Sequence, residues 1–294
     1  MSNRSVGRLP ACLALLWCCA GAAAAEAPQR HSLWSVAGKA NTIYLLGSVH
    51  FLSQSEQLPA VVDEAYGEAE ALIMEIDMDD LDREEMQRVT FELGMLPAEQ
   101  SLEQQLGAET YAQVAQKARQ LGVDPALLQR FRPWLAAMTL VQLHLMKMGL
   151  DPSAGVEHRL TQRATRDSKP IQGLETLREQ LGIMASLPQQ QQREFLEYSV
   201  EDTERATREI DALLAAWRKG DGRALADLLA QGFAEYPDLY RPLTVDRNRK
   251  WLAQIEPLLD DEDDYLIVVG TLHLVGKDSV LELLEGKGHK VRQH

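Results

Sequence analysis

Two histidines in this chain each stand three residues after a glycine and just past an apolar, strand-like run. The copies are Gly47-Ser48-Val49-His50 and Gly270-Thr271-Leu272-His273. Glycine permits a sharp turn there, and ligand sites in α/β folds lie beyond the carboxyl ends of strands. An imidazole at such an edge can bind a metal or move a proton. We expect the two histidines to act as a pair, although either alone could be a hydrogen-bonded turn residue.

A single carboxylate interrupts a third apolar run. Glu75 lies in the otherwise apolar run 71–76, and a buried carboxylate is costly unless it is paired or metal-bound. With His50 and His273 it forms a set that suits Zn²⁺, Mn²⁺ or a similar divalent cation with open positions for water. Such a metal would lower the pKa of bound water and polarise a carbonyl. The alternative is a strand-end acid that reaches solvent.

Two β-α-β units, one near each end of the chain, are predicted to position these side chains. The first has a hairpin, a helix and a buried strand, at 33–36 with 41–46, 57–70 and 71–76. The second has a strand, a helix and a last strand, at 265–269, 276–285 and 289–292. Between them, helix-period apolar patterns occur at 108–121, 132–148 and 153–166, with one short strand at 169–173. We therefore predict one α/β domain over 26–294. Its central mixed sheet comes from both chain ends, and a large helical insertion of roughly 80–260 covers it.

Residues 1–25 are predicted to be a secretory signal. Arg4 and Arg8 precede the apolar run 9–17, and the alanines of 22–25 fit a cleavage site. The apolar run is too short to span a bilayer, and no later segment approaches a spanning length. An uncleaved anchor and a lipidated cysteine are the weaker alternatives. We expect an exported chain, periplasmic or secreted, with no membrane span in the mature part.

The amino-acid composition excludes thiolate chemistry and argues against two classes of partner. All three cysteines lie within residues 1–25, so thiolate catalysis and thiolate metal ligation are excluded from the mature chain. Removal of Arg4 and Arg8 leaves every acidic residue in place, so the net charge becomes two units more negative than the −14 of the full chain. This excess argues against nucleic acids and anionic membranes as partners, because phosphate contacts need clustered cations.

Over essentially its whole mature length, the sequence resembles the TraB/GumN family, which includes the Tiki group of proteases. The resemblance rests on six short segments in order: Tyr44–His50, Met74-Glu75, Gly155-Val156-Glu157, Gly173–Thr176, Arg247-Asn248 and Gly270–Gly276. It implies that paired Gly-x-x-His motifs and acidic residues form a common site. It also implies metal-dependent proteolysis of the kind described for Tiki members, although many bacterial members have no assigned substrate.

The resemblance adds four residues to the candidate site. Glu175 follows the short strand at 169–173 and is expected to be a general base or ligand. Glu157 starts a predicted helix, where an acid is also favoured by the helix dipole alone. Arg247 and Asn248 lie in a polar cluster, where Arg247 is expected to pair with a site carboxylate or stabilise an oxyanion. The alternative for this cluster is a solvated helix face.

The sequence thus predicts an exported, metal-dependent hydrolase of peptide or other acyl bonds. His50, Glu75 and His273 would hold Mn²⁺, Co²⁺ or Zn²⁺, and Glu75 or Glu175 would take a proton from metal-bound water. The partner would be a peptide or small-molecule substrate. The main alternative is a non-catalytic protein that binds a metal, haem or small ligand at the same residues. A third reading, an interaction protein without chemistry, is opposed by the presence of all the motif residues.

Overall fold

The computed structural model describes residues 29–201, 203–234 and 237–294, and its centre is a six-stranded mixed sheet. The strand order is β4-β3-β5-β2-β1-β6. In chain order the strands are β1 Leu33–Ala37, β2 Thr42–Ser48, β3 Ala71–Met74, β4 Ile171–Gly173, β5 Tyr265–Gly270 and β6 Val291–Gln293. Strands β4, β3, β5 and β2 pair in parallel, whereas β1 is antiparallel to both β2 and β6. The predicted α/β class, with a mixed sheet from both chain ends, is confirmed.

Strand pairing brings the ends of the parallel strands to one edge of the sheet. Ser48 pairs with Gly270, and Met74 pairs with both Val268 and Gly173. The residues that follow each strand therefore leave the sheet close together. Strand β5 lies between β2 and β3 and is buried along most of its length, as the continuous apolar run of a central parallel strand requires.

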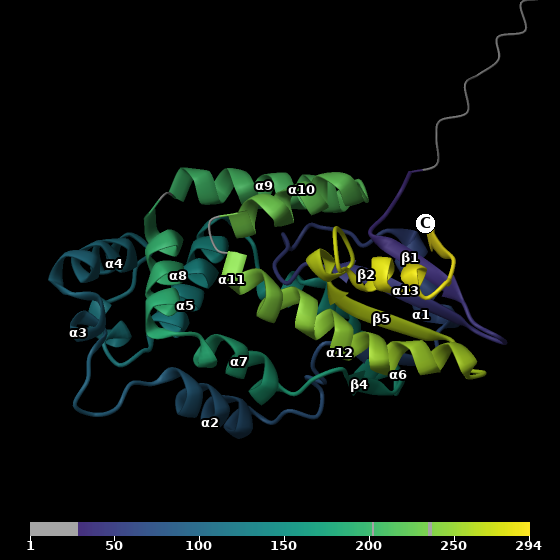
Figure 1. Ribbon diagram of the computed structural model, residues 1–294, viewed down its shortest axis with the longest axis horizontal. Coiled ribbons are helices and arrows are strands. Elements are labelled where there is room, and N and C mark those ends of the chain that lie inside the picture. The colour runs from purple at the N-terminus through teal and green to yellow at the C-terminus, as the bar shows by residue number, and fades with distance from the viewer. Residues whose placement is uncertain (1–28, 202, 235–236) are drawn as a thin grey trace, which may run out of the picture.

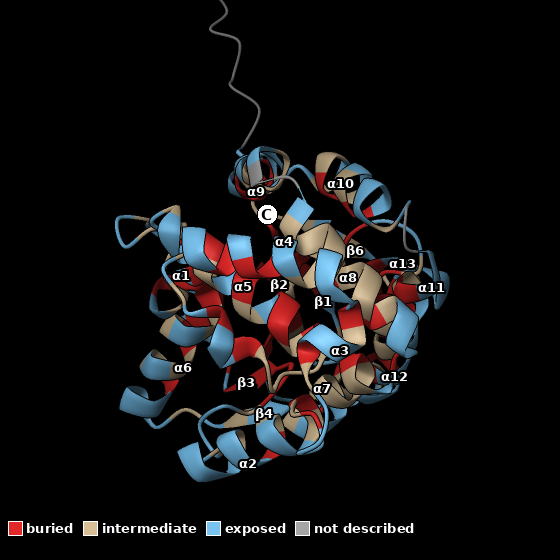
Figure 2. Ribbon diagram, turned by 90° about the vertical axis from the view of Figure 1, so that its left-hand side faces the viewer, coloured by how far each residue is buried: buried red, intermediate tan, exposed pale blue. Residues whose placement is uncertain are grey.

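Helices cover both faces of this sheet. In two perpendicular views, α1 (Ala60–Glu68) and α6 (Val156–Asp167) lie on one side, and α12 (Asp246–Ile255) and α13 (Val280–Gly286) on the other (Figures 1 and 2). The predicted helix over 276–285 begins later, at Val280. The cause is the left-handed backbone of Gly276 and Asp278, with φ of 77° and 55°, which no α-helix can contain.

A helical block stands beyond one end of the sheet, at the left of Figure 1. Its helices, and those beside it, are α2 Arg83–Gly94, α3 Leu102–Leu106, α4 Ala108–Gln120, α5 Pro133–Lys147, α7 Leu177–Ser186, α8 Gln189–Glu201, α9 Thr203–Arg218, α10 Gly222–Ala234 and α11 Pro237–Tyr240. Buried Leu102, Leu106 and Leu140 belong to an apolar cluster of the block, separate from the cluster that surrounds the sheet. Within the described ranges, no helix is both long and apolar enough to cross a membrane.

Candidate active site

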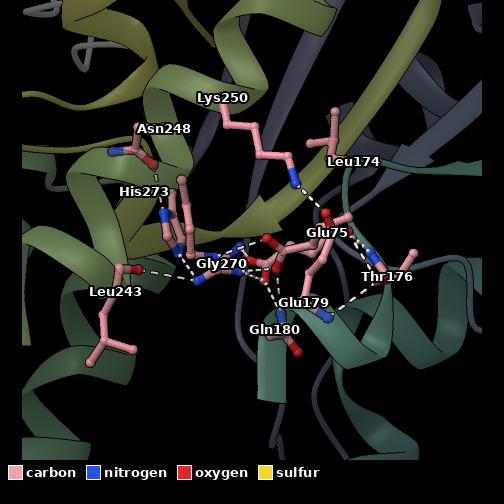
Figure 3. Close-up of polar contacts among 12 residues, drawn as sticks. Glu75, Leu174, Thr176, Glu179, Gln180, Leu243, Asn248, Lys250, Gly270 and His273 are labelled. Atoms are coloured by element: carbon pink, nitrogen blue, oxygen red, sulfur yellow. Dashed lines mark hydrogen bonds and ion pairs between the residues drawn. The ribbon is translucent and has the colours of Figure 1, made fainter. Parts of the chain in front are cut away.

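The guanidinium of Arg247 is the centre of a buried polar network at the carboxyl end of the sheet. Figure 3 labels three of the residues that it contacts, Glu75, Leu243 and His273. Its Nη2 donates to Glu75 Oε2 and to Glu175 Oε1, both at 2.6 Å, and its Nε donates to Glu175 Oε2 at 3.2 Å. Its Nη1 donates to His273 Nε2 at 2.9 Å and to the Leu243 carbonyl at 3.2 Å. These five contacts match the five N–H donors of the side chain. Arg247 thus pairs with two site carboxylates, the first of the two roles expected from the sequence. It cannot take the second role, stabilising an oxyanion, without giving up one of its partners.

The Arg247 side chain reaches the network from the first turn of α12. Five residues with π-helical pairing, Arg241–Val245, lead into that helix. The Arg247 side chain is 11% exposed, and the neighbouring Asn248 is buried. The solvated helix face proposed as the alternative for these two residues is wrong.

Glu75 follows β3 directly, and its carboxylate is held by three hydrogen-bond donors. Oε1 accepts from the Gly270 amide at 2.7 Å, and Oε2 accepts from Gln180 Nε2 at 2.8 Å besides Arg247. Burial alone would raise the pKa of Glu75. The charge that His273 carries only at low pH, the charges of Arg247 and His50, and the Gly270 amide outweigh burial and lower this pKa to about 2. Glu75 is an ionised, paired acid, so the alternative of a strand-end acid in solvent is wrong.

His273 is held in one tautomer by its neighbours. Asn248 donates from Nδ2 to the Asp278 carbonyl at 2.9 Å, which fixes its amide so that Oδ1 faces His273 Nδ1 at 2.7 Å. Because an amide oxygen only accepts, Nδ1 carries the proton and Nε2 accepts from Arg247. Burial lowers the pKa of His273 to about 4, against the attraction of Glu75. At neutral pH the ring is uncharged.

His50 has a different environment at the end of β2. Its Nδ1 lies 2.8 Å from Glu157 Oε1, and the Ser48 hydroxyl donates to the same oxygen. Glu157 comes from the first turn of α6, which approaches so closely that a Cβ on Gly155 would lie 2.2 Å from the His50 carbonyl oxygen. The His50 side chain is 65% exposed, and none of the described residues is hydrogen-bonded to its Nε2. The Glu157 carboxylate, opposed by desolvation, raises the pKa of His50 to about 9.

These groups meet at a cavity of about 530 Å³ between the sheet and the helical block. His50, Glu75, Arg247 and His273 form its polar floor. Glu157, Glu175 and Asn248 lie behind the floor and hold those side chains in place. The structure thus gathers all seven predicted site residues around one cavity, and their chemical roles stay predictions.

The three expected metal ligands do not share an open position in this arrangement. Arg247 occupies His273 Nε2 and Glu75 Oε2, and Glu157 occupies His50 Nδ1. Over the described ranges, no group of three or more His, Cys, Asp or Glu side chains is arranged to hold a metal ion. Metal binding at these three residues therefore stays a prediction, which titration can test.

Sequence reasoning missed two kinds of residue at this site. Gln180 of α7 donates to both Glu75 and Glu175, at 2.8 and 3.0 Å. Ser48 and Thr271 occupy the same place after the glycine in the two Gly-x-x-His motifs, and this shared hydroxyl was an available signal. The Thr271 hydroxyl is buried without a hydrogen-bond partner among the described residues, and its oxygen lies only 2.6 Å from the position that a Cβ on Gly47 would take.

Fold and site together define an α/β protein with a buried arginine–carboxylate network below a cavity. The chain belongs to the TraB/PrgY/gumN family, whose sequence model matches residues 32–293. It is 25% identical over 242 residues to the uncharacterized protein YbaP of Escherichia coli strain K12, an alignment covering 82% of this chain and 87% of that protein. A Shigella flexneri protein of the same name matches equally. No solved structure matches the chain.

Proposed function

We propose that the protein is a hydrolase of peptide or other acyl bonds and that His50 is its general base. The observation that carries this proposal is the His50–Glu157 pair at the cavity floor. A carboxylate holds one ring nitrogen at 2.8 Å, and the other nitrogen has no hydrogen-bond partner in the part of the chain that the structure describes. A histidine oriented in this way can move a proton to and from a bound reactant.

In the proposed reaction, a water molecule attacks the carbonyl carbon of the substrate. Neutral His50 takes the proton of that water at Nε2, and Glu157 stabilises the imidazolium that forms. The bond to the leaving amine or alcohol then breaks, and His50 returns the proton to it. The Arg247 network stays intact through these steps, and its role is to fix the floor.

The proposal predicts a rate that rises with pH. Since the pKa of His50 is about 9, only about 1% of molecules carry the neutral base at pH 7. Below pH 9, kcat/KM should therefore increase about tenfold per pH unit and should level off near pH 9. A profile that is flat between pH 6 and pH 9 would contradict a general-base role for His50.

The direct test is a screen of p-nitrophenyl esters and fluorogenic peptides with matched variants. We expect His50→Gln to lower kcat/KM by a factor of about 10²–10⁴, the usual contribution of a general base. Glu157→Gln should shift the profile to lower pH and should lower the plateau rate reached at high pH, because the imidazolium loses its stabilising carboxylate. His158→Gln is the control, because His158 is exposed and does not line the cavity. Equal loss in His158→Gln, or full activity in His50→Gln, would exclude this mechanism.

Metal titration separates this mechanism from the expected metal-dependent one. Mn²⁺, Co²⁺ and Zn²⁺ would be titrated into wild type and into His50→Ala and His273→Ala. If the acid–base mechanism holds, activity should survive a chelator. Wild type should then have no stoichiometric metal site that both variants lose. A site lost in both variants would support metal-assisted hydrolysis. Ligand binding without any turnover would favour the non-catalytic alternative.

Export is part of the same proposal and rests on residues 1–25, which lie outside the described part of the chain. A basic start, an apolar run and small residues are typical of a secretory signal. N-terminal sequencing of the protein from a periplasmic or secreted fraction should find a start near Glu26. A start at Met1 in that fraction would contradict cleavage.

A further inference from the structure

The cavity above the proposed catalytic floor has walls of one chemical kind. Apart from Ser48, Gln180 and Thr271, the side chains that line the cavity outside the floor are apolar, and they come from four helices of the block and from the short segments beside them. Representative residues are Met138 and Leu145 of α5, Met184 of α7, Phe195 of α8, and Ile210 and Leu213 of α9. The charged lining residues are His50, Glu75 and Arg247, all at the floor. A ligand that fills the space needs a polar end at the floor and an apolar body.

A second cavity, of about 290 Å³, lies against the same walls. It shares Phe195, Ile210, Leu213 and Leu272 with the first cavity, so these four side chains form a common boundary. Val141 of α5 lines the second cavity and is partly exposed, as is Met138 in the first. The apolar surface therefore continues from the floor across this boundary, beyond which the charged side chains of Lys117, Arg205 and Glu209 also line the second cavity. Both volumes are within or close to the range of small-molecule sites, about 300–1,000 Å³.

Because the walls of the cavity are helical, they favour a hydrocarbon chain over a peptide as its ligand. Backbone N–H and C=O groups inside a helix are already paired with one another, so these walls present no strand edge to a peptide. Each peptide amide buried there without a partner would be penalised. A hydrocarbon chain has no such groups and gains from contact with leucine, isoleucine, methionine and phenylalanine.

We propose that this cavity binds a fatty acyl chain, with the scissile ester or amide carbonyl next to His50 and the chain along Leu145, Ile210 and Leu213. The inference rests on the proposed function for the position of the carbonyl, whereas chain binding itself does not depend on hydrolysis.

The test measures binding and turnover separately on the full chain. Binding of straight-chain fatty acids and alkyl amides from four to twelve carbons would be followed by calorimetry. Affinity should rise about fourfold per methylene until the cavity is filled, the equivalent of about 0.8 kcal/mol each. Leu213→Trp and Ile210→Gln should reduce that gain, and Leu127→Trp, at a side chain 66% exposed on the surface, should not. Thermal melts of each variant identify any that are unfolded.

The outcomes separate the inference from the proposed function. Affinity that is independent of chain length, or that is higher for an apolar peptide than for an alkyl ligand of equal size, would overturn the acyl-chain inference. Chain-length-dependent binding that is retained in His50→Gln supports it. Chain-length-dependent binding with no hydrolysis of any ester or amide would leave the inference standing and overturn the proposed function. Hydrolysis of short acyl substrates at a rate that does not depend on chain length would support the proposed function and overturn the acyl-chain inference.

Discussion

Replacement of Arg247 by methionine tests whether the buried network is ionised and paired as described. Glu175 and Glu75 have side chains only 2% and 10% exposed, and both depend on this guanidinium. Removal of one partner from a buried ion pair costs about 3–5 kcal/mol, since the other charge is left uncompensated. This is a large part of a typical free energy of unfolding of about 5–15 kcal/mol. The melting temperature should fall by about 6–20 °C.

The matched control lies on the same helix. Arg249 pairs with Asp278 at 3.0 Å, but its side chain is 55% exposed, so Arg249→Met should cost less than about 1 kcal/mol. Urea unfolding at pH 7, followed by circular dichroism, would compare the two variants. Adding Glu75→Gln and Glu175→Gln to Arg247→Met should recover part of the loss, because neutral amides remove the unpaired charges. If Arg247→Met costs no more than Arg249→Met, or if neutralising the acids recovers nothing, the description of the network is refuted.

Three further predictions concern pH and packing. The pKa of Glu75 falls from about 4.5 to about 2 on folding, so its contribution of about 3 kcal/mol is present above pH 4.5 and lost as the pH falls through 2. In Glu75→Gln, the free energy of unfolding measured with urea should depend less on pH between about 4.5 and about 2. A pH dependence equal to that of wild type would contradict the prediction. The raised pKa of His50 stabilises the fold below pH 6.5, and this contribution is lost as the pH rises through 9. The urea midpoint of wild type should therefore fall over that pH range, and the midpoint of His50→Gln should not. Gly155→Ala should destabilise by about 1–3 kcal/mol, because its Cβ would lie 2.2 Å from the His50 carbonyl oxygen. Gly67→Ala, in helix α1 with no atom within 4 Å of the added Cβ, should stabilise by about 0.5–1 kcal/mol; equal melting temperatures for the two variants would contradict both.

Much of the sheet could be predicted, because the signals that define it are local. Apolar runs at 41–46, 71–76 and 265–269 became β2, β3 and β5 within a few residues of their predicted bounds. A polar site residue lies within three residues of the end of each strand, at His50, Glu75 and His273, and parallel pairing alone brings those residues to one edge. Strand order was not predictable in the same way, because β5 inserts between β2 and β3 from the far end of the sequence.

The buried position of Arg247 could not be predicted from its neighbours. The cluster of 246–250 contains one acid and three cations, a composition typical of a solvated helix face. The structure buries one side of that helix, because Asn248 and Trp251 pack towards His273, with the indole and imidazole centroids 4.6 Å apart. Burial of Arg247 depends on two carboxylates that lie 172 and 72 residues away, at Glu75 and Glu175. Such pairing depends on tertiary contacts, and no local pattern contains it.

The repeated Gly-x-x-His motif suggested one role for two histidines, but in the structure His50 is protonated at neutral pH and His273 is not. His273 faces Asn248 and Arg247 and has a pKa of about 4, whereas His50 faces Glu157 and has a pKa of about 9. Both histidines occupy the same place at the sheet edge, so the difference comes from helices α6 and α12, which supply the partners. Groups whose surroundings separate their pKa values commonly divide the work of a site between them. The proposed hydrolysis uses this difference: the neutral ring of His273, held by Arg247, fixes the floor, and the exposed ring of His50 exchanges the proton.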